Sequence, residues 1–378
     1  MYVVMLHSVG NDKSPWSRRW LSVSLDHFET LCRYLAEKKY TTHFLNEWYG
    51  YFSAPRSKDP GKLVLTFDDG YLDNWVFAFP LLKKYGLKAT VFVNPEFVDP
   101  GQQLRPNLED VWAGRIAEDE MQTLGFLNWP EICAMQQSGI IDIQSHSMSH
   151  NLYFRTNTVI DAYNGQPRYD WLPWITHPER KSFYIAEDQK DLVPACYPVF
   201  EYGRALGLRR YLPDEQLIKG SIELAGKGIS DKNEMINRLQ KLTDQFPGRY
   251  ETDDEIVTRY RYELFESKRI LQEKLNKKVD FLCWPGGGFN ELSLHLSKEA
   301  GYKASTLGSS VDGNTIDNTH TYKRIPRIGL SSFVVCHKGQ HYINDKAHLV
   351  KLLKSRTGNL FLKLALKIKK EVIKKAVL

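Results

Sequence analysis

The sequence has no long hydrophobic run, no regular cysteine pattern and no internal repeat. Without about 18 consecutive apolar residues anywhere in its 378 positions, it is predicted to contain no membrane-spanning helix. Its five cysteines are odd in number and widely scattered, which argues against a disulfide framework or a cysteine metal site and favours a reducing compartment. The 42% of hydrophobic residues is ordinary for a globular protein, and the length allows one barrel-sized domain with additions.

The first residues, Met-Tyr-Val-Val-Met-Leu-His7, lack the basic region and cleavage site of a signal peptide. They are predicted to form the first strand directly. We therefore expect a cytoplasmic protein.

Basic charge is concentrated at the end of the chain. From Lys346 onward there are ten basic residues and a single acid, Glu371, so this segment carries +9. Since the whole chain carries +6, residues 1–345 carry −3. The slightly acidic body gives no electrostatic support for binding nucleic acid.

Within this tail, residues 346–378, the stretch Leu360–Leu378 has an apolar face at helical spacing and a lysine face opposite it. Such a basic amphipathic helix suits an anionic membrane surface, here the inner face of the membrane. The alternative is a solvated terminal helix packed on the body. The apolar positions are Phe361, Leu364, Ala365, Ile368, Val372 and Ala376, and the lysines are 363, 367, 370 and 374.

Strand and helix patterns alternate along most of residues 1–345, which predicts a parallel sheet or barrel. Strands are expected at 2–6, 41–45, 62–67, 89–93, 140–143, 280–284, near Ala304 and at 322–328. Helices are expected at 25–38, 72–84, from 128 to Gly139, at 255–275 and at 292–300, whereas 49–59 is expected to be a loop and 95–125 irregular.

Residues 151–255 interrupt this alternation and are interpreted as a largely helical insertion, because the strand–helix pattern resumes afterwards. Helical patterns are expected around 214–224 and 232–246, after a stretch rich in aromatic residues. Trp171 and Trp174 in that stretch are predicted to stack on sugar rings and so bind substrate. The alternative is that they form a small core of the insertion.

Chemistry is suggested by two motifs, each at the end of an apolar strand. Asp68 and Asp69 follow the apolar run Leu63–Phe67. Two adjacent acids at the end of a buried strand are costly to bury unless a cation compensates them. The alternative to a cation site is that the two acids only form a tight turn. His146 and His150 follow the strand at 140–143 and, being four residues apart, would lie on one side of a helical turn. Two histidines and one carboxylate from neighbouring strand ends would form a three-ligand metal site, leaving the other carboxylate for proton transfer.

These residues resemble the polysaccharide deacetylase (NodB homology, carbohydrate esterase family 4) proteins. Thr66-Phe-Asp-Asp-Gly70, His146-Ser-Met-Ser-His150 and Trp284-Pro285-Gly286 are similar to the first three motifs of that family in order and spacing, over about 60–150 and 255–330. The resemblance implies a distorted (β/α) barrel and one divalent ion, most simply Zn²⁺. It implies Asp69, His146 and His150 as metal ligands, Asp68 as the general base and the Gly286 N–H as an oxyanion donor.

The chain also departs from the family pattern. Cys283-Trp284-Pro285 stands where the family has an arginine before the proline, and Arg327 or Arg324 is a candidate to orient the base or face the substrate in its place. The late Leu-x-x-His motif is not clear. His337 and His341 are candidates for the general acid, and His7 is expected to approach the site from the end of the first strand.

The predicted activity is removal of an N-acetyl or similar acyl group from a carbohydrate, an acylated sugar or a lipid-linked saccharide of surface-polysaccharide assembly. Two alternatives remain open at this point. One is a catalytically weak carbohydrate-binding or scaffold protein on the same barrel, and the other is a deformylase or another hydrolase of carbon–nitrogen bonds.

Overall fold

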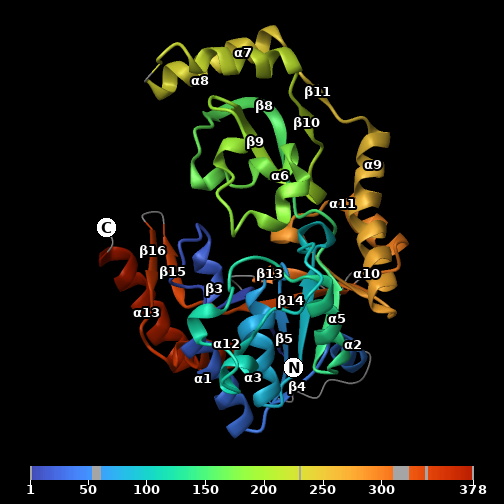
Figure 1. Cartoon of the computed structure of the whole chain (residues 1–378), viewed down its shortest axis with the longest axis vertical. Helices are drawn as coiled ribbons and strands as arrows, with labels where there is room; N and C mark the ends of the chain where they lie inside the picture. The colour runs from blue at the N-terminus through green and yellow to red at the C-terminus, as the bar shows by residue number, and fades with distance from the viewer. Residues whose placement is uncertain (1, 53–60, 230, 310–322, 337–338, 377–378) are drawn as a thin grey trace.

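A computed structural model of the chain describes residues 2–52, 61–229, 231–309, 323–336 and 339–376 (Figure 1). Its centre is a closed ring of seven parallel strands. Their order is β1 (Tyr2–Leu6), β14 (Lys323–Gly329), β13 (Ala304–Ser309), β12 (Phe281–Cys283), β7 (Ile141–Ser145), β6 (Ala89–Val93) and β5 (Lys62–Phe67), which returns to β1. The predicted barrel is therefore confirmed.

The ring is uneven, which makes the barrel a distorted one. β1 pairs with β5 over five residues, whereas β12 and β7 share the single pair Leu282 and Ser145. The short β4 (Thr41–Thr42) adds to the edge beside β5.

Alternation along the strands separates an inner from an outer apolar layer. Val64 of β5, Phe92 of β6 and Ile325 of β14 belong to an inner cluster, which also contains Leu45 and Trp48 of α2 (Leu45–Phe52). The helix α2 occupies the start of the stretch predicted as a loop over 49–59, because its apolar face is needed to fill this cluster. The remainder of that stretch, residues 53–60, lies outside the described residues.

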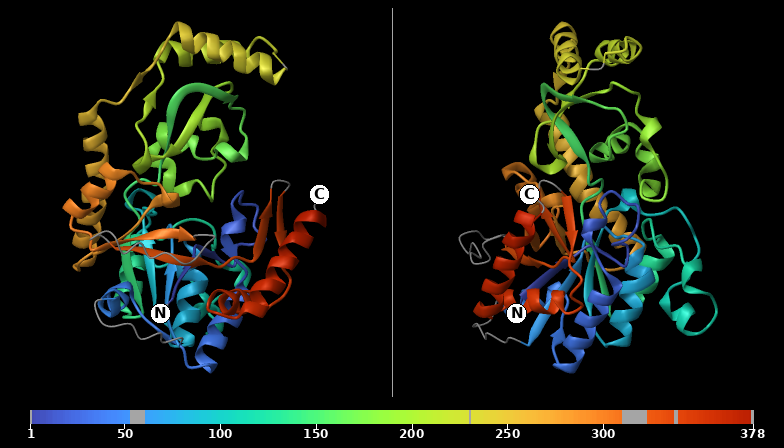
Figure 2. Two further views of the ribbon diagram at one scale, coloured as in Figure 1. Left: turned by 180° about the vertical axis from the view of Figure 1, so that it is seen from behind. Right: turned by 90° about the vertical axis from the view of Figure 1, so that its left-hand side faces the viewer.

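The outer layer packs against helices that cover the barrel (Figure 2). This cluster combines outward-facing residues of β1, β5, β6, β7 and β12 with residues of the covering helices. These helices are α1 (Leu25–Glu37), the π-helix η2 (Asn74–Ala78) with α3 (Phe79–Lys84), α5 (Trp129–Gln137), α9 (Asp253–Arg261), the π-helix η9 (Tyr262–Glu266), α10 (Ser267–Leu275), α11 (Glu291–Glu299) and α12 (His348–Arg356). The stretch 95–125 contains only the short α4 (Leu108–Trp112) and single 3₁₀ turns.

The insertion stands above one end of the barrel in Figure 1. It contains the expected helices and also an antiparallel hairpin, and all of these pack around a second apolar cluster that is rich in aromatic rings. Its elements are β8 (Leu152–Ala162), α6 (Leu172–Thr176), β9 (Pro198–Arg204), β10 (Tyr211–Leu212), α7 (Glu215–Ala225), α8 (Lys232–Gln245) and β11 (Arg249–Tyr250).

The basic tail divides into two helices with different surroundings. In α12, Leu349 and Leu353 are buried in the barrel's outer core, whereas α13 (Leu360–Ala376) lies at the periphery beside the hairpin of β15 (Phe333–Cys336) and β16 (Gly339–Tyr342). Within the described residues, no helix is long and apolar enough to cross a bilayer.

Candidate active site

The predicted site residues meet at the carboxyl end of the barrel, where parallel strands place their following loops together. Asp68 and Asp69 follow β5, His146 and His150 follow β7, and His7 follows β1. They line one cavity of about 940 Å³ together with Gly286, Trp171 and Arg327. The insertion contributes to the same cavity through Tyr202, Gly203 and Arg204 of β9.

The three predicted metal ligands converge on one point. Asp69 Oδ1 lies 3.0 Å from His146 Nε2 and 3.3 Å from His150 Nε2. The other ring nitrogen of His146, Nδ1, is 2.8 Å from the carbonyl oxygen of Cys283, which can only accept a hydrogen bond, so the proton sits on Nδ1 and Nε2 presents its lone pair. A lone pair facing a carboxylate oxygen requires a positive charge between them.

The surroundings shift the pKa values of the two histidines in opposite directions. Burial lowers the pKa of His150 to about 3, which keeps its imidazole neutral as a metal ligand must be. Burial also disfavours the charged form of His146, but Cys283 and Asp69 outweigh it and raise its pKa well above the usual value. One cation held among Asp69, His146 and His150 would accept the lone pairs of both imidazoles and balance the charge of the carboxylate. A set of two histidines and one carboxylate fits a divalent metal with open coordination positions.

The loop that carries the histidines is not the helical turn that their spacing predicts. Ser147 and His150 have φ values of +63° and +51°, and Asp69 has +74°, in the left-handed region that non-glycine residues rarely adopt. Strained backbone at these three positions indicates that the surroundings hold the ligands in place.

The main clamp on this loop is Glu263 of η9, which sequence reasoning missed. One carboxylate oxygen, Oε2, accepts the backbone N–H groups of Met148 at 3.1 Å and Ser149 at 3.0 Å, and the other accepts the Ser149 hydroxyl. The sequence does contain a signal for this residue. Glu263 is an acid on the core-facing side of the periodic helix that also buries Ile256, Tyr260 and Leu271.

Asp68 lies beside the predicted metal ligands and is held by Arg327. The guanidinium donates to both carboxylate oxygens, at 2.6 Å and 2.8 Å, and to Thr66 Oγ1 at 3.2 Å. Burial would raise the pKa of Asp68, but the charge and hydrogen bonds of Arg327 outweigh burial and lower it. Arg327 is buried and paired with Asp68, as expected of a residue that orients the predicted base, and it also lines the cavity, whereas Arg324 lies over the ring of Phe289. The roles of both arginines stay predictions.

Cys283 accounts for the departure from the family's third motif. Its Sγ lies 3.4 Å from Asp68 Oδ2 and 3.2 Å from Arg327 Nη2. A small side chain at this position leaves room for the guanidinium that arrives from β14.

The turn after β12 presents the predicted oxyanion donor. Gly286 has φ +53° and lines the cavity, and among the described residues its N–H donates to no protein acceptor. The role of Gly286 stays a prediction.

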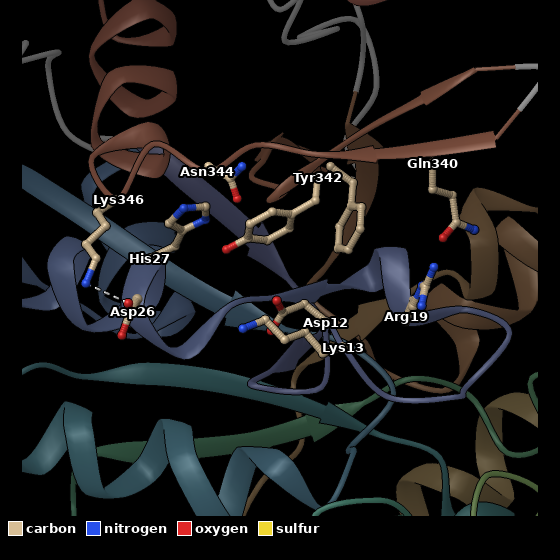
Figure 3. A pocket seen from close by; sticks show the side chains of 10 residues that line it. Asp12, Lys13, Arg19, Asp26, His27, Gln340, Tyr342, Asn344 and Lys346 are labelled. Carbon is tan, nitrogen blue, oxygen red and sulfur yellow. Dashed lines mark ion pairs between the residues drawn. The ribbon is translucent and has the colours of Figure 1, made fainter. Parts of the chain in front are cut away.

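The predicted general acids occupy different places. His337 lies outside the described residues. His341 is exposed on β16, and its neighbours Gln340 and Tyr342 line a separate pocket of about 510 Å³, so that alternation turns His341 to the other face (Figure 3). His7 Nε2, by contrast, is 3.8 Å from Asp68 Oδ2.

The two tryptophans belong to the core of the insertion. Trp171 and Trp174 are 1% and 2% exposed and pack in the aromatic cluster, as the alternative expected, while Trp171 also lines the cavity. Stacking of a sugar ring on either tryptophan stays a prediction. Trp174 instead packs against Phe97, Tyr184 and, at a centroid distance of 6.4 Å, His150.

The part of the chain that carries most of this site is similar to known proteins. Residues 56–171, which contain both motifs predicted to supply metal ligands, match the family model described as polysaccharide deacetylase. This region is similar to the polysaccharide deacetylase family. The family region is also 27% identical over 158 residues to a Bacillus subtilis (strain 168) protein named "Putative polysaccharide deacetylase YxkH", covering 42% of this chain and 54% of that protein.

Solved structures support the fold of the deacetylase family over most of the chain. The deacetylase domain of BpsB from Bordetella bronchiseptica superimposes with a TM-score of 0.50 at 19% identity, covering 87% of this chain and 96% of that one. A de-N-acetylase from Aggregatibacter actinomycetemcomitans gives 0.52 at 17% identity, covering 86% and 94%. The chain spans only about half the length of the curated relative it matches.

Proposed function

We propose that this protein is a metal-dependent hydrolase that removes an acetyl group from an N-acetylated sugar. The observation that carries the proposal is the convergence of Asp69, His146 and His150 on one point, with the ion-paired Asp68 beside them. Asp69, His146 and His150 would hold the divalent ion, for which we propose Zn²⁺. When bound there, such an ion polarises an acyl carbonyl and lowers the pKa of water.

The side chains of this protein supply the remaining steps. Asp68 accepts the proton of the attacking water while the C–O bond forms, and the Gly286 N–H donates to the developing oxyanion, an effect of about 2.7–4 kcal/mol for a well-placed donor. The C–N bond then breaks and His7, beside Asp68, donates a proton to the leaving amine. The products are acetate and the free amino sugar.

The test measures metal content and acyl release in the same preparations. Asp68→Asn should keep its zinc by elemental analysis and lose acetate release, whereas the His146→Ala/His150→Ala double variant should lose the metal. His341→Ala, away from the cavity, is the matched control and should change neither. Full zinc occupancy in the double variant would refute the ligand assignment.

The same assay separates the alternatives. A deformylase releases formate in preference to acetate from matched N-acyl sugars. A carbohydrate-binding protein binds the sugar and releases neither acid.

We also propose that α13 places the enzyme on an anionic membrane surface, where a lipid-linked sugar intermediate of surface-polysaccharide assembly is the expected substrate. Leu362, Leu366 and Ile373 are partly buried on one side of the helix. A second apolar stripe faces solvent, with Phe361 at 81% exposure, and consists of Leu360, Phe361, Leu364, Ile368 and Val372. Helical spacing places Lys363, Lys367, Lys370 and Lys374 in a row along one edge of this stripe, so a basic row borders an uncovered apolar one, the arrangement that suits anionic headgroups.

A further inference from the structure

The catalytic cavity contains more positive charge than the reaction uses. Four arginines line it, and three of them are ion-paired. The pairs are Arg18 with Asp170, Arg168 with Asp161 and Arg327 with Asp68. Within the part of the chain that the structure describes, the guanidinium of the fourth, Arg204, forms no ion pair and no hydrogen bond.

Arg204 reaches the cavity from the last position of β9 and lies directly on the glycine turn after β12. A Cβ built on Gly286 would lie 2.1 Å from Arg204 Nε, and one on Gly288 would lie 2.2 Å from Arg204 Cβ. No side chain other than glycine's leaves room for this arginine, so the Gly286-Gly287-Gly288 run accommodates it. The guanidinium therefore sits beside the N–H predicted to face the reacting carbonyl.

The neighbouring acids are already engaged. Asp68 is paired with Arg327, Asp170 with Arg18, and Asp69 with the two histidines that surround the cation site. A divalent ion at that site adds two positive charges against the single negative charge of Asp69. A partly buried, uncompensated cation is unfavourable, and an anion supplied by the ligand would remove the cost.

We infer that the substrate carries an anionic group, a carboxylate or a phosphate, that Arg204 binds next to the acylamino group. This inference rests on the proposed function, since it names the class of sugar that the deacetylase accepts. A guanidinium suits either group because its planar fork donates two parallel hydrogen bonds. The carboxylate would belong to an acidic sugar ring and the phosphate to a sugar phosphate.

The experiment compares three N-acetylated probes with the zinc-loaded full-length protein: N-acetylglucosamine, N-acetylglucosamine 1-phosphate and the corresponding uronic acid. Calorimetry measures binding and acetate release measures turnover. We expect at least about tenfold tighter binding of one anionic probe than of the neutral one, as one charge-assisted contact provides. The anionic probe that is preferred identifies the source of the charge.

Three variants assign the preference. Arg204→Gln should abolish it and Arg204→Lys should restore part of it. Arg155→Gln should keep it, because Arg155 is exposed on β8 of the same hairpin and pairs with Glu201. Equal binding of all probes by the unmodified protein, or an undiminished preference in Arg204→Gln, overturns the inference.

Failure of the proposed function looks different. In that case no probe releases acetate, while the binding preference and its dependence on Arg204 are still measured.

Discussion

At the scale of single residues, the most consequential contact is the buried pair of Asp68 and Arg327. Each charge depends on the other, and removing one partner of a buried pair costs about 3–5 kcal/mol because the remaining charge is uncompensated. We therefore expect Arg327→Met to lower the free energy of unfolding by about that amount, measured by urea denaturation.

Arg261→Met is the matched control for this change. Arg261 pairs with Glu299 at the surface, where both side chains are more than two-fifths exposed. An exposed pair contributes about 0–1 kcal/mol, so this variant should unfold almost as the unmodified protein does. Similar losses in the two variants would show that Arg327 and Asp68 are not coupled in the way described.

A second residue-scale prediction concerns Asp73, the residue immediately before η2. Its carboxylate accepts hydrogen bonds from Ser8, Asn11 and Asn74. Burial raises its pKa to about 7 despite these bonds. The pKa of Asp73 is therefore higher in the folded protein than the 3.8 expected for the unfolded chain. The contribution of protonated Asp73 to the free energy of unfolding is complete below pH 3.8 and is lost as the pH rises through about 7. Asp73→Asn removes this dependence.

The prediction for Asp73 is a difference between two proteins at two pH values. The free energy of unfolding of Asp73→Asn, relative to the unmodified protein, should increase by about 2–3 kcal/mol between about pH 5 and about pH 8. Taking the difference cancels the titration of every other group. A pH-independent difference would mean that Asp73 is ionised throughout the range.

At the scale of elements, η9 connects the outer helices to the predicted metal site through Glu263. Glu263→Ala leaves the Met148 and Ser149 N–H groups without their acceptor, so the loop bearing both histidines loses its anchor. Residues that orient metal ligands typically contribute 10–100-fold to affinity, and we expect a loss of about this size in zinc affinity, measured by competition with a chelator.

Glu266→Ala tests the specificity of that effect. Glu266 lies on the same π-helix but pairs with Arg269 at the surface. Its variant should bind zinc as tightly as the unmodified protein. If the Glu263→Ala variant bound zinc as tightly as the unmodified protein, contacts other than those of Glu263 would hold the loop that carries the histidines.

The elements also show what sequence could and could not predict. Strand ends and the two motifs follow from local patterns, so the barrel and the grouping of Asp69, His146 and His150 were predictable. The loop conformation at Ser147 was not, because it depends on Glu263, more than a hundred residues away. Arg204 was equally hidden, since it enters the cavity from an insertion whose sequence shows no motif.

At the scale of the whole molecule, α13 should decide whether the protein binds vesicles. The full chain should float with vesicles of anionic phospholipid at low salt, and a truncation after Asn359 should not. The truncation keeps α12, whose buried residues belong to the core. A full chain that stays in the soluble fraction would contradict the membrane proposal.

Two full-length variants separate the apolar from the electrostatic contribution. Replacing Phe361, Ile368 and Val372 with Ser should abolish flotation at every salt concentration. Replacing Lys363, Lys367, Lys370 and Lys374 with Gln should reduce it and remove most of its salt dependence, because exposed charges are screened by salt.

The closure of the ring between β1 and β14 also sets the order of events on the ribosome. Asp68 leaves the ribosome 259 residues before Arg327 does. At synthesis rates of 5–20 residues per second, the acid is without its partner for roughly 13–50 s. During that interval β1 also lacks β14, so the nascent chain exposes an open strand edge that a chaperone can occupy, and Asp68 gains its partner only after β14 has been synthesised.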